Sequence, residues 1–273
     1  MTVHARPNPK GLSAEERAAM SHRFIKRHDV AMMLLHWFNA LVWLLELATG
    51  AGLIVSDRYS FVPAGFTEFM LNIFGSRASM LQFHIAVGVF WTVVLLVYGI
   101  VGFKSYALSF YRNDLAIDRD DLRWLKNKAL RILGRPVRLP EQGLFNAGQK
   151  LYAWVVSIGS AVIIGTGFVM AYHIGPQWLI QWSMPLHFGA VGAVVAGLVI
   201  HVYMGSILPE ERPAFFSMLH GRVNELYAYE YHTKWWCQRK KEERDFREEL
   251  AREEEREAKS SERVRHPPGL RIK

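Results

Sequence analysis

Four histidines stand inside apolar stretches of this sequence, at His36, His84, His187 and His201. An imidazole in an apolar helix is either a hydrogen-bonded polar residue between helices or part of a functional site. Imidazole is a common ligand of transition metals, and two imidazoles can fill both axial positions of one haem iron. The depths at which the four residues lie decide between these interpretations.

The spacing of the histidines predicts two pairs. His187 and His201 are fourteen residues apart, which on one helix is within about 40° of the same face and roughly 21 Å along the axis. His36 comes early in its own apolar stretch, and His84 comes early in the next one, which must run in the opposite direction. We therefore expect His84 to face His187 near one membrane surface and His36 to face His201 near the other.

Two facing imidazoles suit a six-coordinate haem iron, which has no open position for substrate and transfers electrons. Zinc is a weaker candidate, because two histidines without a nearby cysteine or carboxylate make an incomplete shell. A proton relay is the other alternative, but it does not explain the pairing by depth. Small residues nearby could let a flat macrocycle approach the backbone, or could simply allow close helix packing; they are Gly50, Gly88, Gly189 and Gly192.

The single cysteine, Cys237, leaves no internal disulfide, no cysteine-ligated iron-sulfur cluster and no covalent haem attachment within this chain. Any haem is therefore expected to be held noncovalently.

The apolar stretches are long enough to form four membrane-spanning helices. A span needs about 20 largely apolar residues for a hydrocarbon core of roughly 30 Å. The third uncharged stretch is too long for one span, and Gly175-Pro176 is expected to divide it. The expected helices cover Val30 to Ile54, Arg77 to Lys104, Leu151 to Tyr172, and Pro185 to Ile207.

The basic residues predict the direction of these spans. All 33 lysines and arginines except Arg58 and Arg77 fall in residues 1–30, 103–150 and 207–273. Because such residues are retained in cytoplasmic loops, the topology is expected to be N-in and C-in. The fold class is all-α, an integral membrane four-helix bundle. It divides into a cytoplasmic N-terminal segment (1–29), a transmembrane dihaem domain (30–207) and a cytoplasmic C-terminal tail (208–273).

Two further features lie outside this plan. Glu46 sits about 15 Å beyond His36, near the middle of the first span. We expect it to be neutral or hydrogen-bonded to a neighbouring helix, with a water-filled proton path as the alternative. Residues 238–262 are rich in Glu, Arg and Lys, which favours a solvated, charged cytoplasmic helix over a partner-docking segment.

The chain resembles the gamma subunit, cytochrome b556, of respiratory formate dehydrogenases. The run Asn146-Ala147-Gly148-Gln149-Lys150 is the most specific part of the resemblance. The other matching stretches are Arg23-Phe24-Ile25, His36-Trp37, His84, His187, His201-Val202-Tyr203-Met204, and Met218-Leu219-His220-Gly221-Arg222-Val223.

The resemblance implies two b-type haems, held by His36, His84, His187 and His201, in a multi-pass protein of the bacterial cytoplasmic (inner) membrane. It also implies an iron-sulfur beta subunit and a molybdenum or tungsten catalytic alpha subunit as partners, with formate oxidised there and not by this chain. Quinone would bind near His201, beside Asn146 and Gln149. The residues alone favour another role for Asn146 and Gln149, as the cap of the third helix, and Lys150 is expected at the water boundary. Lipid is expected around the bundle, and no nucleic acid.

Two other functions stay open at this point. The same module could serve a hydrogenase or a sulfur-compound reductase, because the catalytic partner is not visible in this sequence. A histidine- and glutamate-based proton or solute transporter is the alternative from another class, although the spans show no inverted repeat.

Overall fold

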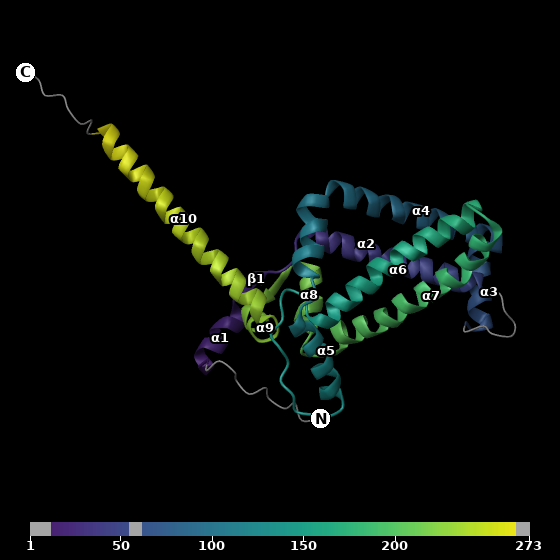
Figure 1. Cartoon of the computed structure of the whole chain (residues 1–273), viewed down its shortest axis with the longest axis horizontal. Coiled ribbons are helices and arrows are strands. Elements are labelled where there is room, and N and C mark those ends of the chain that lie inside the picture. Colours follow the sequence, from purple (N-terminus) through teal and green to yellow (C-terminus); the bar gives the residue numbers. More distant parts are fainter. Residues whose placement is uncertain (1–11, 55–61, 266–273) are drawn as a thin grey trace, which may run out of the picture.

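The structure is a computed structural model that describes residues 12–54 and 62–265. Four helices in these residues are long and apolar enough to cross a membrane. They are α2 (Val30–Leu53), α4 (Arg77–Val101), α6 (Ala147–Tyr172) and α7 (Gln177–Val202). Figure 1 shows them running lengthwise beside one another. The predicted all-α membrane bundle is thus confirmed.

The spanning helices pack as two antiparallel pairs, α2 with α4 and α6 with α7. Within the first pair, the indole nitrogen of Trp91 donates to Asn39 Oδ1 at 2.7 Å. Within the second, a Cβ at Gly159 would lie 2.5 Å from Val194, so only glycine allows this approach. Helix pairs that meet through small residues and interhelical hydrogen bonds are typical of membrane bundles.

The predicted beginning of the fourth span at Pro185 is wrong. Helix α7 begins at Gln177, directly after Pro176, and Pro185 lies inside it. The predicted break at Gly175-Pro176 is present and α7 follows it directly, because a membrane helix tolerates a proline such as Pro185 in its interior. The earlier start places His187 about 15 Å from the first residue of α7. The other three boundaries agree with the prediction to within a few residues.

Helices α4 and α7 continue beyond their α-helical part in wider turns. The π-helices η1 (Phe103–Ala107) and η2 (Phe110–Asp114) follow α4, and η3 (Tyr203–Ile207) follows α7. The other described helices are α1 (Ala14–His22), α3 (Ala64–Phe74), α5 (Arg119–Ile132), α8 (Arg212–His220), α9 (Glu225–Tyr231) and α10 (Thr233–Arg265). Helix α10 extends away from the bundle (Figure 1) and confirms the predicted charged C-terminal helix.

A short sheet joins the chain segments that precede and follow the four spanning helices. Strand β1 (Phe24–Lys26) pairs antiparallel with β2 (Arg222–Asn224), with Ile25 opposite Val223. The sequence did not predict these strands. Because β1 precedes α2 and β2 follows α7, the chain enters and leaves the bundle at the same end.

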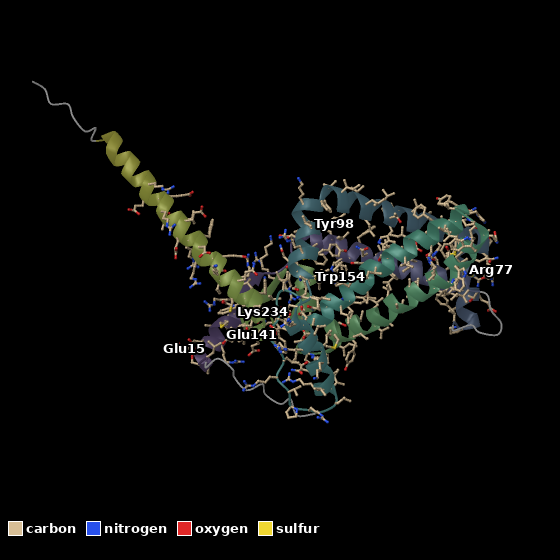
Figure 2. All side chains as sticks on the ribbon, viewed as in Figure 1. Glu15, Arg77, Tyr98, Glu141, Trp154 and Lys234 are labelled. Atoms are coloured by element: carbon tan, nitrogen blue, oxygen red, sulfur yellow. The ribbon has the colours of Figure 1, made fainter. Side chains whose placement is uncertain are left out.

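The segment between α4 and α6 meets the sheet at this end. Lys234 Nζ lies 2.7 Å from Asp120 Oδ2, and Arg27 donates to the carbonyl of Leu144 at 2.9 Å. A buried cluster of Val223, Tyr227, Ala228 and Trp235 fills the centre. Figure 2 shows Glu141 and Lys234 at this end and Arg77 at the opposite one. The three segments with most of the basic residues therefore come together. Arg58, one of the two exceptions, lies outside the described residues.

Candidate functional site

The structure brings His36 and His201 together at the end of the bundle that carries the sheet. Their ring centres are 6.4 Å apart and the ring planes are inclined by 55°. Two imidazoles that bind one metal ion from opposite sides, with bonds of about 2 Å, have ring centres roughly 6 Å apart. The pair predicted from the sequence thus already has the separation that a shared axial metal requires.

His84 is held by α2 through its Nδ1 atom. This atom lies 2.9 Å from Thr49 Oγ1 and 2.7 Å from Glu46 Oε2. The Thr49 hydroxyl donates its proton to the carbonyl of Leu45 at 2.8 Å, so its oxygen accepts from the imidazole. The hydrogen-bond network therefore assigns the proton of His84 to Nδ1 and leaves Nε2 with a free lone pair.

His187 has the same arrangement in the other helix pair. Its Nδ1 atom lies 3.0 Å from Thr166 Oγ1, and the Thr166 hydroxyl donates to the carbonyl of Val162 at 2.6 Å. The proton again belongs on Nδ1, and Nε2 is again free to bind a metal. Thr49 and Thr166 both lie within two turns of the ends of α2 and α6 that are far from the sheet, so the two histidines share a level.

The two outer histidines do not make the ring contact that the inner pair makes. Within the described residues, each instead rests against a glycine of the neighbouring helix. A Cβ at Gly50 would lie 3.5 Å from His84 Cε1, and one at Gly167 would lie 3.6 Å from His187 Cε1. Gly189 and Gly192 have open space beside them, where a Cβ would meet nothing within 4 Å. The sequence had indicated three of these glycines and missed Gly167.

Glu46 is hydrogen-bonded to a neighbouring helix, one of the roles expected for it. Its partner is His84, a candidate metal ligand. The sequence did not predict this contact between Glu46 and His84. Its second carboxylate oxygen, Oε1, is buried and has no hydrogen-bond partner among the described residues. A Cβ at Gly88 would lie 3.7 Å from this oxygen, so the carboxylate packs directly against α4.

Asn146 and Gln149 form a capping box at the beginning of α6. The amide of Gln149 donates to Asn146 Oδ1 at 3.0 Å, and the amide of Asn146 donates to Gln149 Oε1 at 3.0 Å. The capping interpretation is therefore confirmed. The box uses only the oxygens of the two carboxamides, and both side chains are partly exposed.

The sequence suggested that Lys150 lies at the water boundary, and this is wrong. Its ammonium group is buried 2.8 Å from Asp121 Oδ2 and donates to the carbonyl of Ala116. This ion pair fixes the beginning of α6 against α5.

Tyr152 is a site residue that sequence reasoning missed. Its ring stacks on His201 with centres 5.0 Å apart and planes inclined by 26°. A Cβ at Gly197 would lie 2.6 Å from the Tyr152 ring, so Gly197 makes room for it. The signal was a glycine one helical turn before His201, a candidate ligand, but the residue of α6 that faces this glycine depends on the rotation of the helices, which the sequence does not give.

A buried polar cluster lies at the end of the bundle that carries the sheet. Tyr227 donates to Glu211 at 2.8 Å, and His232 Nε2 lies 3.3 Å from both the Tyr227 hydroxyl and Arg27 Nη2. Burial, assisted by Arg27, lowers the pKa of His28 to about 3 and lowers that of His232 well below its usual value. Burial also raises the pKa of Tyr227. Both histidines are thus neutral at physiological pH. The sequence had given neither of them a ligand role.

Comparison with known proteins places these features in a family. Residues 27–221 match the family model described as prokaryotic cytochrome b561. The cytochrome b556(Fdn) subunit of the nitrate-inducible formate dehydrogenase of Escherichia coli is 25% identical over 124 residues, covering 44% of this chain and 55% of that protein. The chain thus spans about half the length of this relative. The formate dehydrogenase cytochrome b556 subunit of Haemophilus influenzae is 19% identical over 216 residues, covering 78% of this chain and 82% of the relative.

Proposed function

Since the chain belongs to the prokaryotic cytochrome b561 family, and is thus a membrane protein that binds haem b, we propose that it is the dihaem membrane subunit of a respiratory formate dehydrogenase. In this role, two b haems held by this chain would supply electron transfer between an iron-sulfur subunit and quinone. The proposal is supported by the names of the two relatives and by the geometry of the histidines.

His36 and His201 are the proposed axial ligands of the inner haem, and His84 and His187 those of the outer haem. The separation of 6.4 Å between the inner rings is the single observation that carries this assignment. At the outer level, Thr49 and Thr166 each direct a histidine to expose Nε2. A haem held by two histidines would supply electron transfer and would have no position left for substrate.

The proposed quinone site lies at the beginning of α6, beside His201. Asn146 and Gln149 keep their carboxamide N–H groups outside the capping box, and such donors can hold a quinone carbonyl. Stacking of Tyr152 on His201 would fix the wall of this site. Quinone reduced here would take its protons from the side of the membrane where the sheet lies.

That side is proposed to be the cytoplasm, with the chain N-in and C-in in the bacterial cytoplasmic membrane. Residues 1–29 and 208–273 are then cytoplasmic, and residues 30–207 form the dihaem domain. The distribution of basic residues supports this orientation, and the pairing of β1 with β2 supports the placement of both ends on one side. Reporter fusions at the two termini test it, and activity of a periplasm-specific reporter there would contradict it.

The proposed partners are an iron-sulfur beta subunit and a molybdenum or tungsten alpha subunit that oxidises formate. Purification of the complex through this chain tests their identity. Recovery of a hydrogenase or a sulfur-compound reductase would assign the same membrane module to another enzyme.

The haem assignment is tested by counting haems in the purified protein. We expect two b haems per chain, and about half of this content in His36→Ala and in His187→Ala. His220→Ala is the matched control, because His220 is an exposed residue outside the spans, and its haem content should be unchanged. A colourless wild-type protein would favour the transporter alternative, and full haem content in the ligand variants would refute the ligand assignment.

A further inference from the structure

Glu46 is the only acidic residue within the four spanning helices, where a carboxylate is costly. It is not paired with a lysine or arginine in the described part of the chain. Its Oε2 atom lies instead 2.7 Å from His84 Nδ1, and its side chain is mostly buried. A costly group placed against one particular nitrogen of a candidate haem ligand requires an explanation.

We infer that Glu46 is a positioning residue that shares the Nδ1–H of His84 with Thr49, as the nearer acceptor, and thereby lowers the reduction potential of the outer haem. The inference rests on the proposed role of His84 as a ligand and extends it to a residue outside the ligand set.

The physical basis is the effect of a second partner on a ligand histidine. A carboxylate that accepts the distal N–H of a metal-bound imidazole fixes the ring orientation and makes the imidazole a stronger electron donor. Stronger donation favours ferric over ferrous iron, and hydrogen bonding near the iron is one of the means by which proteins set haem potentials.

Among the residues that the structure describes, none of the other three histidines has a carboxylate partner. His187 Nδ1 faces the neutral hydroxyl of Thr166, and His36 Nδ1 has no hydrogen-bond partner among the described residues. His201 contacts the rings of Tyr152 and His36. The carboxylate thus acts on one level of the bundle only. It would separate the two potentials in the direction that favours electron movement from the outer to the inner haem.

A purely structural role, in which Glu46 only ties α2 to α4, makes a different prediction. The bond from Trp91 to Asn39 also ties these helices, at 2.7 Å, and involves no ligand histidine. Asn39→Leu is therefore the matched control, because it removes a polar contact between the same two helices and leaves His84 with its partners.

The experiment is a redox titration of both haems in the purified complex, for the wild type, Glu46→Gln and Asn39→Leu. Mutation of a residue that hydrogen-bonds a metal ligand typically lowers metal affinity or activity by about 10-fold or more. We expect Glu46→Gln to shift the oxidation equilibrium of one haem at least tenfold toward the reduced form, which is about 59 mV for a one-electron couple. The second haem, and both haems in Asn39→Leu, should keep their potentials.

Two haems with unchanged potentials in Glu46→Gln would overturn the inference and leave the proposed function intact. A wild type without haem would overturn the proposed function itself. If Glu46→Gln fails to retain the outer haem, the wild type still decides the question. Near-infrared magnetic circular dichroism of its ferric haems should then show two charge-transfer bands of different energy, because only one haem has a ligand with a carboxylate partner. A single shared band energy would refute the inference.

Discussion

The buried ion pair between Lys150 and Asp121 offers a direct test of how the beginning of α6 is held. The two charged groups are 2.8 Å apart, and their side chains are only 10% and 5% exposed. Removing one partner of a buried pair leaves an uncompensated charge and costs about 3–5 kcal/mol. Lys150→Met should therefore lower the free energy of unfolding by this amount.

A double-mutant cycle separates the pair from other losses. Asp121 also accepts from the amide of Asp118 at 2.9 Å in the capping box of α5, so Asp121→Ala should cost about 1 kcal/mol more than Lys150→Met. The double variant should be more stable than the sum of the two singles predicts, by about 2–3 kcal/mol, because neither charge is then left alone.

The assay is the thermal midpoint of the purified full-length protein in detergent, followed by haem absorbance. One kcal/mol corresponds to about 2–4 °C for a chain of 150–250 residues, so Lys150→Met should lower the midpoint by roughly 10 °C. Lys126→Met, at an exposed position on α5, is the control and should change little. Equal thermal midpoints for Lys150→Met and Lys126→Met would refute the reasoning. So would a double variant whose loss of stability equals the sum of the losses in the two single variants.

Three further predictions use the same assay. Gly197→Ala places a Cβ 2.6 Å from the Tyr152 ring and should cost about 1–3 kcal/mol and alter the inner haem spectrum, whereas Gly189→Ala, with open space beside it, should do neither. Burial lowers the pKa of His28 from 6.5 to about 3, so the unfolded chain binds a proton below about pH 6.5 and the folded chain does not. The free energy of unfolding should therefore fall below about pH 6.5 by up to about 1.4 kcal/mol per pH unit. His28→Asn should make this fall smaller between pH 7 and 5. A chain that ends after Arg244 should keep its stability within about 0.5 kcal/mol and its full haem content, since the side chains beyond it are exposed through residue 256; a large loss would show that the tail supports the bundle.

The spanning helices could be predicted because a membrane span needs about 20 consecutive apolar residues, which can be recognised in the sequence. The apolar stretches predicted the ranges of three of the four spans. The pairing of His36 with His201 followed from the expected depth of the two residues in the membrane. The beginning of the fourth span was predicted too late, at Pro185, although a membrane helix tolerates a proline in its interior.

The contacts of individual polar side chains could not be predicted in the same way. Whether Glu46 faces His84, water or another helix depends on the rotation of α2 against α4, which a lone acidic residue does not fix. Lys150 was expected at the water boundary because it begins a span, but α5 covers it and supplies Asp121. Helix α5 has apolar residues at helical spacing, which indicates an amphipathic helix but not which spanning helix it covers.

The repeated contact of a threonine with a histidine argues most clearly for metal binding at the outer level. In both helix pairs, a threonine gives its own proton to the carbonyl one turn earlier and accepts the Nδ1–H of a histidine on the antiparallel neighbour. A histidine that only filled space between helices would be satisfied by either tautomer. A ligand must present one defined nitrogen, and a partner on Nδ1 is the usual way to fix it. The same device on two helix pairs therefore favours a shared requirement for a free Nε2 at that depth over incidental polar packing.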